Sequence, residues 1–95
     1  MSLKKITQKQ QDYREELAEY NEEMIFYDGF EDALIGVLTQ FGRPPIALYD
    51  REKCIKILME DGMDEEGAEE FFSFNSEGSY VGDSTPAFAI FVKKG

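Results

Sequence analysis

Carboxylates are the side chains of this sequence that gather closely enough to suggest chemistry. One group lies around Gly29 and another around Gly62; their members are Asp28, Glu31 and Asp32, then Glu60, Asp61, Asp64, Glu65 and Glu66. Carboxylate oxygens are the ligands that magnesium, calcium or manganese would use. Neither group has the spacing of an EF-hand loop, and the second also provides the acids that favour the first turn of a helix. We therefore expect no metal site and no cofactor.

Other catalytic groups are scarce. The chain has no histidine, which is the commonest general base and metal ligand, and one cysteine, Cys54. A catalytic thiolate would need a base, and no glycine-rich phosphate loop is present. We therefore expect a protein that is not an enzyme and has no catalytic residue. The alternative is a divalent-metal-dependent enzyme that acts on phosphate esters through carboxylates such as Asp28, Asp32 and Asp50.

Negative charge dominates the second half of the chain. The net charge is −10, and residues 57–92 carry nine acids and no base. Such a surface repels nucleic acid and anionic membranes, so we expect neither as a partner. The acids at 60–70 could be a solvated face that keeps the protein dispersed, a contact surface for a protein, or a mimic of nucleic-acid phosphates. The candidate contact residues on this face are Glu65, Glu66, Glu69 and Glu70.

The single cysteine excludes an intrachain disulfide and agrees with a reducing compartment. No apolar run reaches the roughly 18 residues of a membrane span, so a cytoplasmic location is expected. Cys54 shares the apolar face of a predicted helix with Ile55 and Leu58, which predicts a buried thiol that does not react with thiol reagents.

The N-terminal residues predict a helix over 7–23. Thr7 and Gln10 have the spacing of a capping box. One narrow apolar stripe follows, formed by Tyr13, Leu17, Tyr20 and Met24. A stripe this thin suits a peripheral helix that covers the domain, or a seam against a partner or a second copy. The chain is accordingly divided into an N-terminal helix at 1–24 and a single α+β domain at 25–95.

The remaining elements alternate between extended and helical patterns. Residues 33–39 predict a strand, with a helix as the alternative; a turn at 40–45 and a strand at 46–49 would complete a hairpin. Asp50 and Asp64 are N-caps for helices over 51–61 and 65–75. Residues 87–92 are apolar on both faces, which predicts a central strand. The result is an α+β fold, in which a small mixed or antiparallel sheet packs against a helix pair and the N-terminal helix is peripheral.

A core follows from these predicted faces. The apolar positions that point inward are Ile35, Val37, Ile46, Leu48, Ile55, Leu58, Phe71, Phe72, Phe88 and Ile90.

Several short strings between residues 29 and 91 occur together in a recognisable way. They are the run 29–37, Pro45 to Asp50, Asp61 to Met63 with Ala68, and Phe74–Asn75 through Gly78–Gly82 to Thr85–Pro86. In this combination the chain resembles a family of short, uncharacterised proteins of tailed bacteriophages and prophages. The resemblance implies a phage origin and expression in the cytoplasm of a bacterial host. It implies no activity, cofactor or site residue.

Taken together, these features predict a small acidic protein-interaction protein. Its partner would be a protein, for example a host factor, and the chain would be a monomer or a homodimer. The N-terminal stripe and the acidic face are its two candidate contact surfaces. A structural or assembly component of a virion is a further alternative.

Overall fold

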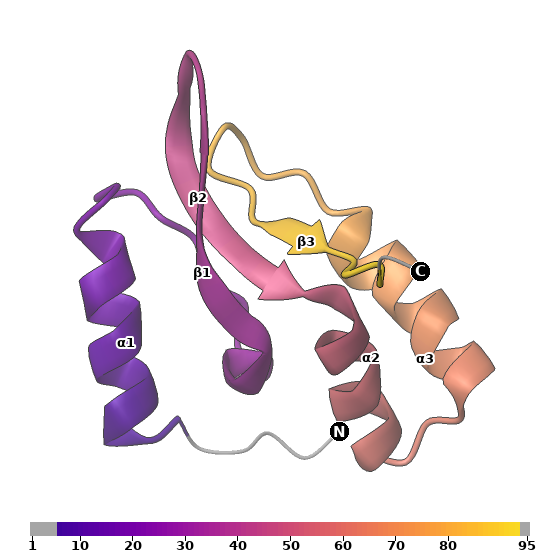
Figure 1. The fold of residues 1–95 in the computed structure, drawn as a ribbon. Helices are drawn as coiled ribbons and strands as arrows, with labels where there is room; N and C mark the ends of the chain where they lie inside the picture. Colours follow the sequence, from indigo (N-terminus) through magenta and orange to yellow (C-terminus); the bar gives the residue numbers. More distant parts are fainter. Residues whose placement is uncertain (1–5, 94–95) are drawn as a thin grey trace.

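The computed structural model describes residues 6–93, which form three helices and a three-stranded sheet. Along the chain these are α1 (Gln8–Ala18), β1 (Leu34–Gln40), β2 (Arg43–Asp50), α2 (Arg51–Glu60), α3 (Glu65–Phe72) and β3 (Ala87–Ala89) (Figure 1). A 3-10 turn, Glu31–Ala33, precedes β1, and a π-helical turn, Ser73–Glu77, follows α3. This is the predicted α+β class. The two segments predicted from the sequence, 1–24 and 25–95, include residues 1–5 and 94–95, which lie outside the described residues.

The three helices begin at the caps that the sequence predicts. Thr7 accepts a hydrogen bond from the Gln10 amide, and the Gln10 side chain in turn accepts one from the Thr7 amide. Asp50 and Asp64 accept amide hydrogen bonds in the first turns of α2 and α3. Each cap satisfies a donor that the helix itself cannot pair. The starts of the helices are therefore encoded locally.

The sheet is mixed, and its strand order is β1-β2-β3. β1 and β2 form the predicted antiparallel hairpin, whereas β3 runs parallel to β2 after the chain has crossed over through α2 and α3. The strand assignment for residues 33–39 is thus correct, and the helical alternative is excluded. A bulge between Leu34 and Gly36 shifts the register of β1.

The hairpin turn is shorter than the predicted turn at 40–45. Gln40 pairs with Arg43, so the turn consists of Phe41 and Gly42, and Gly42 has a φ of 77°. Pro44 and Pro45 belong to β2, where a register shift sets them opposite a single residue of β1. Bulges and strand edges are the places where a sheet tolerates proline, and β3 does not extend to this part of β2.

β3 is an edge strand of three residues, so the prediction of a central strand over 87–92 is wrong. Its last pair joins Ala89 to Asp50, which is also the N-cap of α2. Because β2 turns into a helix at this point, no strand remains for residues 90–92 to pair with. Apolar residues on both faces of this stretch therefore do not indicate burial on both faces.

α1 ends at Ala18, five residues before its predicted end. Asn21 donates from Nδ2 to the Pro45 carbonyl at 2.9 Å and to Ser84 Oγ at 3.1 Å. These contacts draw the chain toward the edge of β2, and hydrogen bonds of the i to i+3 type close the last turn. As a result Tyr20 and Met24 do not continue the helical stripe.

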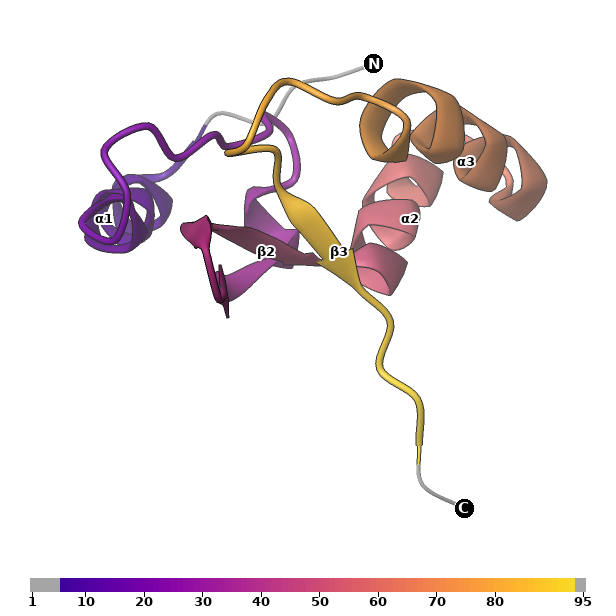
Figure 2. The same ribbon diagram turned by 90° about the horizontal axis from the view of Figure 1, so that it is seen from above.

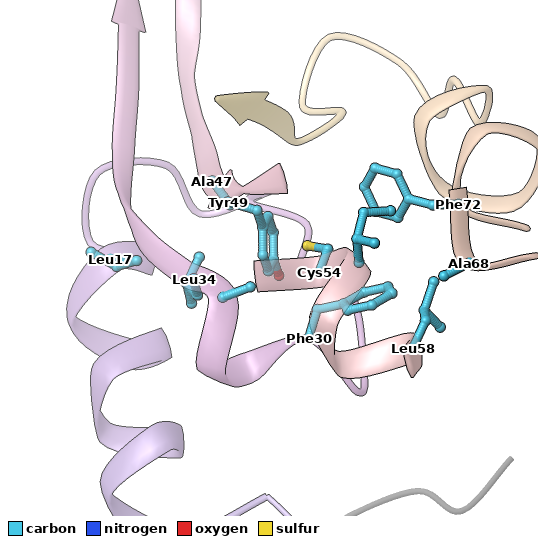
Figure 3. Packing of buried hydrophobic residues seen from close by; sticks show 11 residues of the cluster. Leu17, Phe30, Leu34, Ala47, Tyr49, Cys54, Leu58, Ala68 and Phe72 are labelled. Carbon is cyan, nitrogen blue, oxygen red and sulfur yellow. The ribbon is translucent and has the colours of Figure 1, made fainter. Parts of the chain in front are cut away.

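The core lies between the sheet and the helices (Figures 1 and 3). Of the predicted core, Ile55, Leu58 and Phe72 are buried, and three more residues pack against the core: Val37, Phe71 and Phe88. The phase of β2 was predicted wrongly. Ala47 and Tyr49 point inward, whereas Ile46 and Leu48 are half-exposed on the other side, as is Ile35 in the bulge. Ile90 lies beyond β3 and is exposed.

The phase of β2 follows from its partners. The Tyr49 hydroxyl accepts a hydrogen bond from the Tyr27 amide at 2.8 Å, and its ring contacts Phe88. Since side chains alternate along a strand, placing Tyr49 inside also places Leu48 outside.

Candidate interaction surfaces

α1 is fastened to the segment that precedes β1. Nη2 of Arg14 lies 2.6 Å from the Glu31 carboxylate and donates to the Tyr27 carbonyl at 3.2 Å. The same guanidinium lies over the Phe26 ring, and Gln10 donates to Asp32 at 2.8 Å. Both charged side chains of the Arg14–Glu31 pair are largely buried. The helix is therefore held by a specific polar contact as well as by its apolar residues.

The predicted stripe residues have different environments. Leu17 is 6% exposed and belongs to the core, and Tyr13 and Met24 pack against that core. Tyr20 is 62% exposed and lies beyond the end of α1. Of the four, Tyr20 is thus the residue that presents most of its side chain to a partner, and the role of the stripe in binding stays a prediction.

The acidic face lies on α3. Glu65, Glu66 and Glu70 are exposed, and Glu69 forms a bidentate ion pair with Arg51 of α2, at 3.2 and 2.9 Å. The hydrogen bond from Arg51 lowers the pKa of the Glu69 carboxyl below its usual value. Glu69 consequently joins the two helices, whereas its three neighbours are available for contact.

The carboxylates of the enzymatic alternative take part in local structure. Asp28 lies 3.4 Å from the Arg14 guanidinium, Asp32 accepts a hydrogen bond from Gln10, and Asp50 caps α2. Among residues 6–93 no group of three or more His, Cys, Asp or Glu side chains is placed to hold a metal ion.

A surface that the sequence analysis missed lies on the side of the sheet opposite the core. Leu38 and Ile46 form one cross-strand pair on this side, and Leu48 and Ala87 form another. We call Leu38, Ile46, Leu48, Ala87 and Ala89 the outer sheet face. All five are half-buried, and none belongs to the core cluster or packs against it.

The helices leave this face uncovered. In Figure 2 they lie beside and above the sheet, and the chain after β3 runs away below it, where the picture shows no other described element. This C-terminal segment, residues 90–93, carries three exposed apolar side chains. The exposed fractions of Ile90, Phe91 and Val92 are 62%, 64% and 83%.

More apolar surface borders the outer sheet face at the hairpin end. Phe41 at the turn is fully exposed, and so is most of Tyr80. A small pocket here is lined by the apolar residues Leu38, Pro44, Ile46 and Tyr80 and, at its polar side, by Gln40, Arg43, Gly82, Asp83 and Thr85. The outer sheet face therefore adjoins the loop before β3 through a pocket with both apolar and charged walls.

A signal for this surface is present in the sequence. Both phases of the two hairpin strands are apolar, a pattern that is typical of a sheet covered on both faces. The sequence predicts one helix pair and one further helix, which can cover only one face of the sheet. The predicted helices are enough to cover one of the two apolar faces of the sheet, so the sequence indicates that the other face is left exposed.

Comparison of the chain with protein-family models, curated proteins and solved structures found no match. The phage resemblance therefore stays a prediction. Within the described part of the chain, no helix has both the length and the apolar character required to cross a membrane.

Proposed function

We propose that this chain is a non-enzymatic protein-interaction protein that contacts its partner through the outer sheet face and the C-terminal segment. The supporting observation is the exposure of Ile90, Phe91 and Val92 next to a half-exposed apolar sheet. Folded domains rarely leave a large contiguous apolar patch in water, and such patches mark contact sites. A phage origin and a partner in a bacterial host are part of the proposal and depend on the sequence resemblance alone.

The charge distribution supports the same surface. Residues 33–42 and 84–92 contain no charged residue, although the chain as a whole carries −10. Charged residues are depleted at the centres of protein interfaces, where aromatic residues are enriched. The apolar surface thus has the composition of an interface core.

Affinity capture from a bacterial lysate with the tagged full-length chain tests the contact surface. We compare the wild type with Leu38→Glu and Phe91→Glu, which place a charge on the sheet face and on the C-terminal segment. The matched control is Phe74→Glu, because Phe74 is 78% exposed on the π-helical turn. We expect proteins captured by the wild type and the control to be lost with both charged variants.

Two results would overturn this assignment. One is capture that survives both Leu38→Glu and Phe91→Glu. The other is capture that is lost only when Glu65, Glu66 and Glu70 are all replaced by Gln, which would assign binding to the acidic face. Circular dichroism of each variant ensures that a loss of capture does not reflect unfolding.

Calorimetric titration of the protein with magnesium and with calcium tests the non-enzymatic part of the proposal. We expect no saturable heat of binding. A saturable signal that disappears in the Asp28→Asn and Asp32→Asn variants would support the metal-dependent alternative instead.

A further inference from the structure

We infer that the partner of the outer sheet face is a second copy of this chain, whose C-terminal segment lies on it. Two chains would exchange these segments reciprocally, so that each sheet receives the segment of the other. This inference rests on the proposed function and names the occupant of its contact surface.

The C-terminal segment has the properties of an extended strand whose apolar side chains do not pack against another element. It continues directly from β3, it has no regular secondary structure, and its three apolar residues are mostly exposed. Phenylalanine and the β-branched residues Ile and Val favour extended structure packed on a sheet. Within the described residues, the segment therefore carries apolar side chains that are suited to cover the outer sheet face.

The local sequence favours a second copy over the chain's own sheet. For the segment to cover its own face, the chain would have to reverse direction immediately after Ala89. Residues 87–92 contain no glycine, proline, asparagine or aspartate, which are the residues that form tight turns. Figure 2 shows the segment leading away from the sheet rather than back across it. An extended segment that leaves its own domain can reach an identical face on a neighbour.

The charges of the segment are compatible with such a contact. From residue 84 to the end, the only charged residues are Lys93 and Lys94, whereas the whole chain carries −10. The segment therefore brings no carboxylate to the contact with an acidic copy of its own chain. The acidic α3 lies away from the outer sheet face, so two copies joined at their sheets keep most of their carboxylates apart.

The area that such an exchange can bury reaches the lower end of the range for stable dimers. With the exposed fractions given above, each apolar side chain of the segment offers on the order of 100 Å². A reciprocal exchange buries two segments and two matching areas of sheet, which together amount to at most roughly 1,200 Å². This total is at the lower limit for specific protein interfaces, and a two-fold arrangement uses the same contact twice.

Sedimentation velocity of the full-length chain over a range of concentrations tests the inference. We expect a dimer for the wild type and for Phe74→Glu, and a monomer for Phe91→Glu. Because the side chains of Phe91 and Phe74 are both largely exposed, neither substitution should prevent folding. A wild type that stays monomeric throughout, or a Phe91→Glu variant that dimerises like the wild type, contradicts the inference.

Mixed disulfide formation locates the contact. A Phe91→Cys chain is mixed with an Ile46→Cys chain under mild oxidation, and the control mixture combines Phe74→Cys with Ile46→Cys. We expect the covalent heterodimer to form at least tenfold faster in the first mixture. Equal rates would contradict the exchange.

The outcome also separates this inference from the proposed function. A monomeric wild type whose lysate partners are lost with Leu38→Glu would eliminate the second copy as the occupant and leave the contact surface in place. A dimer that is insensitive to both Leu38→Glu and Phe91→Glu would contradict the inference alone, whereas lysate capture that survives both substitutions would contradict the proposed function.

Discussion

Arg14 of α1 and Glu31 of the turn before β1 form an ion pair of 2.6 Å in which both side chains are largely buried. The Glu31 carboxylate also accepts a hydrogen bond from the Gly29 amide at 2.9 Å. The pair thus joins the N-terminal helix to the loop that leads into the sheet, across 17 residues of sequence.

Replacing Arg14 by Ala should destabilise the protein strongly. Glu31 would lose its guanidinium partner in a largely buried site, and removing one partner of a buried pair costs about 3 kcal/mol. Urea unfolding followed by circular dichroism measures the change in the free energy of unfolding. The control is Lys9→Ala on the same helix, since Lys9 is exposed and its loss should cost less than about 0.5 kcal/mol. Equal effects of the two substitutions would refute a structural role for the pair.

The helix α1 should behave as part of the domain in a deletion experiment. Leu17 contributes to the same buried cluster as residues from α2 and α3, so a chain without residues 1–23 exposes part of its core. We expect the truncated chain to lose cooperative thermal unfolding. If it instead unfolds cooperatively and only its binding or oligomeric state changes, the helix is an interaction element.

Single substitutions in the stripe refine this result. Leu17→Ala should lower the free energy of unfolding by roughly 2–4 kcal/mol, because it removes a buried side chain and leaves a cavity. Tyr20→Ala should have little effect on stability, because most of the Tyr20 side chain is in water. Chemical denaturation of both variants checks the contrast, and a large loss with Tyr20→Ala would argue against it.

Tyr49 should make stability fall at alkaline pH. Burial raises the pKa of its hydroxyl from 10.0 to about 12. Because the folded state holds this proton more tightly, the contribution is complete below about pH 10 and is lost as the pH rises through about 12. The full effect amounts to roughly 2–3 kcal/mol.

The measurement compares the wild type with Tyr49→Phe at several pH values. The variant also loses the acceptor for the Tyr27 amide, so it should be less stable at neutral pH. The difference in the free energy of unfolding should shrink between about pH 10 and 12. A difference that does not depend on pH would mean that Tyr49 titrates normally in the folded protein.

Cys54 should react with a maleimide only after unfolding. Its side chain is fully buried beside Tyr49 and Phe72 (Figure 3). The labelling rate is measured with and without denaturant, and a Phe74→Cys variant serves as the accessible reference, because Phe74 is 78% exposed and lies outside the contact surface. Labelling of Cys54 as fast as that of the reference, under native conditions, would disprove its burial.

The parts of the fold that could be predicted depend on local interactions. Thr7, Asp50 and Asp64 satisfy amides within three residues, so the helix starts can be identified from short strings. The buried faces of α2 and α3 follow from helical spacing, as Leu58 and Phe72 illustrate. The α+β class follows from these elements.

The parts that could not be predicted depend on distant contacts. The end of α1 is set by Asn21, whose side chain bonds Pro45 and Ser84. The phase of β2 is set by the contact between Tyr49 and Tyr27, since Ile46 and Leu48 are as apolar as the residues that are buried. The same ambiguity concealed the candidate site, because an apolar residue on a strand does not reveal whether a helix covers it.

Hydroxyl-radical footprinting of the wild-type chain over a range of concentrations tests the central claim most directly, because it reports the solvent exposure of individual side chains without any substitution. Phe91 and Leu48 report on the contact surface, and Phe74 is the internal reference. We predict that oxidation of Phe91 and Leu48 falls at least threefold as concentration rises, while that of Phe74 stays constant. Oxidation of Phe91 and Leu48 that remains unchanged relative to Phe74 at every concentration would contradict the account.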